Sequence, residues 1–206
     1  AEAWTKVADP TVIICNRREK CRTNTHIKSI APHLFANWAE RFPSNPADPN
    51  ATARAYLQAR GLDPTKFDFE QGTWTEQGHH ITTVAFSCPW TKKKWHRFLD
   101  IPKGIEGKTR WDKAEGESYQ GHAWTTGEID SSQPLWMVEG ILEALSLQQG
   151  LGFQAATTFS AHHIPTRFYE QLDTSQEIII ALNADNAGQD GTHKNLEQLK
   201  KLGFKQ

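Results

Sequence analysis

The last third of the chain constrains the fold most, because short apolar strands alternate there with helices over short connections. The strands are predicted at residues 135–138, 154–159 and 178–182, and the helices at 141–149, 165–172 and 192–202. Alternation of this kind is typical of a parallel sheet that is covered by helices. The sequence therefore predicts an α/β domain over residues 134–206, and we expect this domain to be incomplete.

Two further stretches precede this domain. Between them, residues 43–49 are rich in proline, so they cannot form the interior of a helix. Residues 51–60 predict a helix that Asn50 caps and Gly61 ends. Strands of period two follow, at residues 67–76, 80–88, 95–101 and 118–125. We therefore divide this part of the chain into a basic N-terminal segment and a small α+β unit, residues 1–48 and 49–133.

Composition excludes some classes of function. The chain has 23 basic and 24 acidic residues, which excludes a simple polycationic nucleic-acid binder but allows a basic groove that balances an acidic metal site. No apolar run approaches the ~20 residues that span a bilayer, so we expect no membrane partner. Three cysteines give no disulfide framework and fit a reducing compartment, so we expect a cytoplasmic location.

Oxygen-bearing side chains cluster at the ends of the first and third predicted strands of the α/β domain. Glu139 ends the first strand, and Glu143 follows one helical turn later. Asn183 and Asp185 follow the third strand and share one face of an extended segment. Ligands of parallel sheets bind beyond the carboxyl ends of the strands, and grouped carboxylates stay ionised when Mg²⁺ or Mn²⁺ compensates them. We therefore predict a metal site at this end of the sheet.

A simpler interpretation is also open for these acids. Glu139 would then be an acid that a helix N-terminus favours, and Asp185 a turn residue. Either motif alone favours this alternative. Both motifs together, each directly after an apolar strand, favour the metal site.

The two motifs resemble those of a known family. Residues 135–144, LWMVEGILEA, and residues 178–188, IIIALNADNAG, resemble the first and second motifs of the TOPRIM fold. Residues 56–64, YLQARGLDP, look like the segment that opens the catalytic core of DnaG-type primases. The strand and basic loop that precede TOPRIM in those primases also have counterparts here: the similar stretches are residues 95–99, 108–111 and 118–121. The resemblance covers residues 50–204 and points to primases of plasmids, phages or integrative elements, which are often fused to a helicase.

The resemblance implies a role for each oxygen ligand. Glu139 would bind metal and assist proton transfer, and Glu143 stands where the family usually has Asp. Asp185 is the second acid of the Asp-x-Asp pair, whereas Asn183 occupies the place of the first, so one negative charge is missing and metal affinity should fall. The chain is then natural and weakened, natural and non-catalytic, or an engineered inactive form. A further family acid is expected past the end of this sequence, because Asp190 is a poor candidate.

The function that the resemblance implies is that of a DNA primase catalytic core. Such a core synthesises short RNA primers on single-stranded DNA from nucleoside triphosphates, by metal-dependent nucleotidyl transfer, and works with a replicative helicase. The alternative is a catalytically weakened module that binds single-stranded DNA or a helicase without synthesis. Nuclease or topoisomerase chemistry fits less well, because no tyrosine lies in a supporting motif and the basic upstream segment would be unexplained.

A basic segment with interleaved aromatic residues precedes the α/β domain. Cations meet backbone phosphates and aromatic faces stack on bases, so this segment suits a single-stranded template or an incoming nucleotide. The candidate residues are Trp95, Arg97, Lys108, Arg110, Trp111 and Lys113. The alternative is a solvated loop with tryptophans in the core.

The N-terminal segment holds candidate Zn²⁺ ligands: Cys15, Cys21 and His26. The fourth ligand would be His33 or a residue outside this sequence. DnaG-like primases carry a zinc ribbon at this place. The fold class that the resemblance implies is a TOPRIM domain, a parallel sheet flanked by helices, preceded by a small α+β basic subdomain and a short zinc-ribbon-like tail. Because the segment lacks a CxxC pair, the alternative is a remnant with reduced thiols and no metal.

Overall fold

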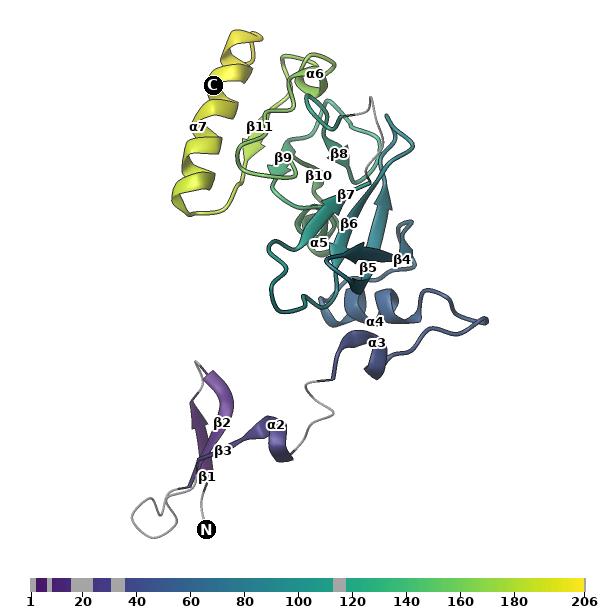
Figure 1. Cartoon of the computed structure of the whole chain (residues 1–206). Helices are drawn as coiled ribbons and strands as arrows, with labels where there is room; N and C mark the ends of the chain where they lie inside the picture. Colours follow the sequence, from purple (N-terminus) through teal and green to yellow (C-terminus); the bar gives the residue numbers. More distant parts are fainter. Residues whose placement is uncertain (1–2, 7–8, 16–23, 31–35, 113–117, 206) are drawn as a thin grey trace.

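The computed structural model describes residues 3–6, 9–15, 24–30, 36–112 and 118–205, which contain three sheets (Figure 1). The first sheet is antiparallel, and its elements, with a short helix beside it, are β1 (Ala3–Lys6), β2 (Asp9–Cys15), β3 (Asn24–His26) and α2 (Ile27–Ile30). Cys15 ends β2 and His26 ends β3. Cys21 and His33 lie outside the described residues, so the zinc site stays a prediction.

The second sheet lies in the middle of the chain and is antiparallel, in the order β4-β5-β6-β7. One helix packs against its first two strands and a shorter helix packs against that helix. These elements are α3 (Trp38–Arg41), α4 (Ala51–Ala59), β4 (Glu70–Glu76), β5 (His79–Ser87), β6 (Lys94–Phe98) and β7 (Thr109–Trp111). The first three strands confirm the prediction, whereas β7 was not predicted.

The start of α4 is capped differently from the prediction. Asn50 occupies the N-cap position, but its side chain accepts a hydrogen bond from the backbone N–H of Gln71, at 2.8 Å, and not from α4. The side chain of Gln71 in turn accepts from the N–H of Ala53, at 2.9 Å, so a residue of β4 caps the helix. This exchange fixes α4 on the sheet. Gly61, with φ +78°, ends the helical segment as predicted.

The third sheet is the α/β domain, in the order β11-β9-β10-β8. Strands β11, β9 and β10 are parallel, and β8 is antiparallel to β10. The elements are β8 (Trp124–Thr125), β9 (Leu135–Val138), α5 (Ile141–Leu151), β10 (Gln154–Thr157), α6 (Thr166–Tyr169), β11 (Ile178–Ile180) and α7 (Asn186–Lys201). Leu135 and Met137 of β9 pack with α6 and α7, whereas Val138 packs with α5. The predicted alternation of parallel strands and helices is therefore confirmed.

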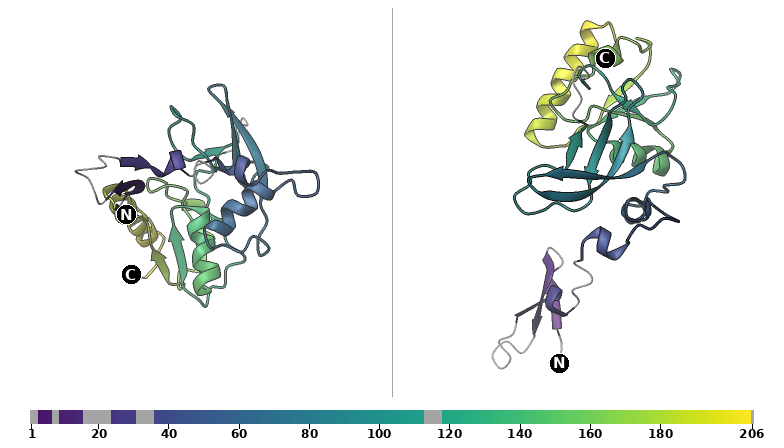
Figure 2. Two further views of the ribbon diagram at one scale, coloured as in Figure 1. Left: turned by 90° about the horizontal axis from the view of Figure 1, so that it is seen from below. Right: turned by 45° about the vertical axis from the view of Figure 1, so that its right-hand side comes forward.

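Helix α5 joins the two larger sheets. Its Ile141, Leu142 and Leu145 are buried in one cluster with Leu57 of α4 and Phe86 of β5. Burying a side chain of this size stabilises the fold by about 1.5–3 kcal/mol, so the cluster holds the sheets together around the first turns of α5. Helix α7 lies on the side of the third sheet that is remote from the middle sheet (Figures 1 and 2).

Two helix boundaries differ from the prediction. Helix α5 runs past Gly150 to Leu151, and its C-cap is Gly152, whose φ of +72° is left-handed. Helix α7 begins at Asn186 and not at residue 192. The glycines near its start suggested a loop, but packing requires them: a Cβ on Gly188 would overlap the backbone carbonyl of Asn183.

The strand predicted at 118–125 is wrong over most of its length. Only Trp124–Thr125 is a strand, and it pairs with β10 in the third sheet rather than with the middle sheet. The chain therefore enters the third sheet before residue 134. Across the part of the chain that the structure describes, no helix is both long enough and apolar enough to cross a membrane.

Candidate active site

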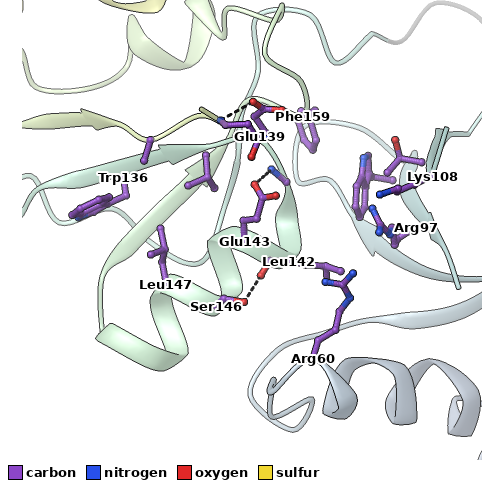
Figure 3. A pocket seen from close by; sticks show the side chains of 16 residues that line it. Arg60, Arg97, Lys108, Trp136, Glu139, Leu142, Glu143, Ser146, Leu147 and Phe159 are labelled. Atoms are coloured by element: carbon purple, nitrogen blue, oxygen red, sulfur yellow. Dashed lines mark hydrogen bonds between the residues drawn. The ribbon is translucent and has the colours of Figure 1, made fainter. Parts of the chain in front are cut away.

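A pocket of about 750 Å³ opens between the third sheet and the middle sheet (Figure 3). It brings oxygen-bearing side chains from the ends of β9 and β11 opposite cations from the end of α4, from β6 and from the segment before β7. The charged and amide residues that line it are Arg60, Arg97, Lys108, Glu139, Glu143 and Asn183. A volume of this size is typical of sites for small ligands.

Glu139 lies directly after β9, at the carboxyl end of the parallel sheet. The register pairs Met137 with Ile180, so the residues that follow β9 and β11 lie side by side. The Oε1 atom of Glu139 accepts a hydrogen bond from the backbone N–H of Asn183, at 2.9 Å. The structure therefore brings Glu139 to the segment that holds Asn183, as the strand order predicted.

Two other carboxylates at this end of the sheet cap helices. Oε2 of Glu143 accepts from the N–H of Gly140, the N-cap residue of α5, at 2.9 Å, which is the half of a capping box that a glycine N-cap allows. Asp185 is the N-cap of α7, and its Oδ1 accepts from the N–H of Gly188, at 2.8 Å. Glu143 lines the pocket, whereas Asp185 lies outside its lining. Each carboxylate has lone pairs beyond the one that capping uses, so capping leaves room for a further contact.

The donor set determines which metal this end of the sheet suits. Within the described residues, no group of three or more His, Cys, Asp or Glu side chains could hold a metal ion. The predicted ligands would be the carboxylates of Glu139 and Asp185 and the amide oxygen of Asn183, which are hard ligands of the kind that Mg²⁺ and Mn²⁺ prefer. These three donors are therefore of the right chemical type for Mg²⁺ or Mn²⁺. Because the amide carries no charge, they should bind either ion weakly.

Three cations lie across the pocket from Glu139 and Glu143 (Figure 3). Arg97 comes from β6, and its Nε donates to the hydroxyl of Tyr56 at 3.3 Å, which orients the guanidinium. Arg60 lies over the ring of the same tyrosine, with 5.1 Å from Cζ to the ring centroid. Lys108 is exposed just before β7. Sequence reasoning predicted Arg97 and Lys108 but missed Arg60, although the YLQARGLDP segment that resembles the primase core contains it.

The other predicted nucleic-acid contacts have different surroundings. Arg110 forms a bidentate pair with Glu76, with both N–O distances 2.7 Å, and this hydrogen bonding raises the pKa of the guanidinium. Trp111 stacks on a neighbouring tyrosine, at 5.0 Å between ring centroids, and lies outside the pocket lining. Trp95 contributes to the lining although most of its surface is buried. Lys113 lies outside the described residues.

Comparisons with known proteins agree with this architecture. Residues 136–206 match the model of the Toprim-like family. A solved structure described as the DnaG catalytic core superposes with a TM-score of 0.54 at 14% sequence identity, and the match covers 82% of this chain and 65% of that chain. This chain thus spans less than two thirds of that core, and at this identity the likeness establishes the fold alone. No curated protein matches the chain. The TOPRIM part of the predicted fold is confirmed: the chain has a fold similar to that of the DnaG catalytic core, and residues 136–206 match the Toprim-like family, whereas the zinc-ribbon-like tail stays a prediction.

Proposed function

We propose that the chain is a DNA primase catalytic core, which joins nucleoside triphosphates into a short RNA primer on single-stranded DNA. The observation that carries the proposal is the pocket, in which Glu139 and Asn183 face Arg97 and Lys108. Phosphoryl transfer needs this pairing, because oxygen ligands hold a divalent cation while basic side chains bind the phosphates of the substrate. The Toprim-like domain and the fold of the DnaG core support the same function.

In this mechanism the two walls of the pocket bind different parts of the substrates. Arg97 and Lys108 bind the triphosphate of the incoming nucleotide and offset its negative charge. Glu139, Asn183 and Asp185 would hold Mg²⁺ or Mn²⁺, which supplies charge stabilisation at the reacting phosphate when it is bound. The Oε2 atom of Glu139 accepts the proton of the primer 3′-hydroxyl as its oxygen attacks the α-phosphate and pyrophosphate leaves.

A second candidate function is a primase-derived module that binds single-stranded DNA or a helicase without synthesis. The amide of Asn183 favours it, because one charge of the family pattern is missing. The cations of the pocket would then bind the phosphates of a DNA strand. A replicative helicase as partner, an origin in a mobile element, zinc at Cys15, Cys21 and His26, and a cytoplasmic location accompany either function as predictions.

Primer synthesis on single-stranded DNA with labelled nucleoside triphosphates tests the proposal. The assay is run with Mg²⁺ and with Mn²⁺, on the chain and on the Asn183→Asp variant, each with and without Glu139→Ala. Removal of the Glu139 carboxylate should lower synthesis by at least about 100-fold, as for a group that acts in proton transfer. Glu177→Ala is the matched control, because Glu177 is an exposed glutamate just before β11, at the opposite end of the same sheet. Equal synthesis by the Glu139→Ala and Glu177→Ala variants would contradict the assignment.

A further inference from the structure

Phe159 has a backbone conformation that bulky residues rarely adopt. Its φ is +65°, in the left-handed region that favours glycine. Among the non-glycine residues that the structure describes, Gln77 also has a positive φ, but it lies in the two-residue turn between β4 and β5, where such angles are required. Phe159 follows β10 and lies in no such turn. Strain of this kind persists only where the surrounding structure fixes it, and it concentrates at functional sites.

Hydrogen bonds of the two threonines before Phe159 hold its backbone conformation. The hydroxyl of Thr157 donates to the backbone carbonyl of Glu139 at 2.7 Å and accepts from the N–H of Phe159 at 2.9 Å. The N–H of Thr158 donates to the carbonyl of Val138 at 2.8 Å. Both threonines are fully buried. The backbone of Phe159 is therefore fastened to the end of β9, beside the proposed catalytic carboxylate.

The side chain of Phe159 lies at the boundary between the pocket and the core, because it packs against the cluster around α5 and also lines the pocket. It is half-buried and belongs to the lining, and in the view of Figure 3 its ring lies between Glu139 and Lys108. Three rings contact it at steep angles: Trp111 at 4.8 Å and 75°, Trp90 at 6.1 Å and 62°, and Tyr119 at 6.0 Å and 69°. The ring of His163 lies closer to parallel, at 6.4 Å and 29°. The ring is thus held rigidly where the acidic and basic walls of the pocket meet.

We infer that Phe159 is the stacking surface for the base of the incoming nucleoside triphosphate. The inference rests on the proposed function and deepens it, because it adds a base-binding surface to a pocket that so far binds phosphate and metal. Aromatic rings next to phosphate-binding cations are the combination that holds nucleotides, and one stacked base corresponds to about 5- to 150-fold in affinity. Stacking accepts every base, so purine and pyrimidine nucleotides should both depend on Phe159.

The test removes the ring without disturbing the backbone. Glycine adopts a φ of +65° freely, so Phe159→Gly keeps the chain path and deletes the stacking surface, while Phe159→Tyr keeps the ring. Phe69→Leu is the control for loss of a half-buried phenylalanine outside the pocket. Calorimetric titrations in Mn²⁺ compare ATP, CTP and inorganic triphosphate, which lacks the base, and melting temperatures establish that each variant is folded.

The parent chain should bind ATP and CTP about 5- to 150-fold more tightly than inorganic triphosphate. Phe159→Gly should remove this difference and leave the affinity for inorganic triphosphate unchanged, whereas Phe159→Tyr and Phe69→Leu should keep it. If a folded Phe159→Gly variant binds ATP as tightly as the parent, the stacking role is wrong while the nucleotide site stands. If the parent chain binds neither ATP nor inorganic triphosphate, the nucleotide site of the proposed function is wrong and the stacking role with it.

Discussion

Replacing Asn183 by aspartate should change metal affinity and the stability of the metal-free protein in opposite directions. Residue 183 is exposed and lines an open pocket, so an added charge is screened almost as in water. Two unit charges about 4 Å apart in water interact by about 1 kcal/mol, so a divalent cation should gain about 2 kcal/mol, or about 30-fold in affinity. Repulsion between the new carboxylate and Glu139 should lower the free energy of unfolding of the metal-free protein by about 1 kcal/mol.

Two measurements check these opposite effects. The electron paramagnetic resonance signal of free Mn²⁺ gives the affinity, and urea unfolding in the presence of a chelator gives the stability. Asn45→Asp is the matched control, because Oδ1 of Asn45 accepts hydrogen bonds from two backbone N–H groups, which a carboxylate also can do, in a loop outside the pocket. An unchanged Mn²⁺ affinity in Asn183→Asp, or an equal rise in Asn45→Asp, would contradict a charge effect at residue 183.

Three further predictions concern single residues. Gly188→Ala should lower the free energy of unfolding by about 3 kcal/mol, because the added methyl group would overlap a backbone carbonyl. Gly150→Ala, at an open helical site, should raise the free energy of unfolding by about 0.5–1 kcal/mol, and thermal melts compare the two variants. Burial lowers the pKa of His163, so its neutral form stabilises the folded state. This contribution is complete above the pKa of about 6.5 of the unfolded chain, and it is lost as the pH falls from there towards the folded-state pKa. The pH dependence of Tm should therefore flatten in His163→Gln. Arg110→Lys should lower stability by about 1 kcal/mol and leave ATP affinity unchanged, whereas Arg97→Lys should weaken ATP binding in calorimetry with little change in Tm.

The parts of the fold that the sequence predicted are those with strong local signals. The apolar run of β9 stands out because both faces of a central parallel strand are buried, so no polar residue interrupts it. The same signal placed Glu139 and Asn183 at the ends of neighbouring strands, which the hydrogen bond between them confirms.

The parts that the sequence did not predict depend on contacts between distant segments. Gln71 caps α4 by accepting a hydrogen bond from the N–H of Ala53, which lies 18 residues earlier in the chain. No local capping pattern therefore reveals it. Gly188 has the sequence character of a loop residue, yet it lies in α7. Glycine is required there because the backbone of Asn183 passes too close for a side chain. Arg60 and Phe159 enter the pocket only once α4 and β10 are packed around α5.

Primer synthesis by the Asn183→Asp variant on single-stranded DNA, with Mn²⁺ and labelled nucleoside triphosphates, tests most directly whether this chain is a primase. The parent chain and the double variant Asn183→Asp, Glu139→Ala are measured beside it. Synthesis should rise with Asn183→Asp and vanish in the double variant. Silence from all three proteins, while each still binds single-stranded DNA, would contradict the catalytic claim and leave a primase-derived binding module.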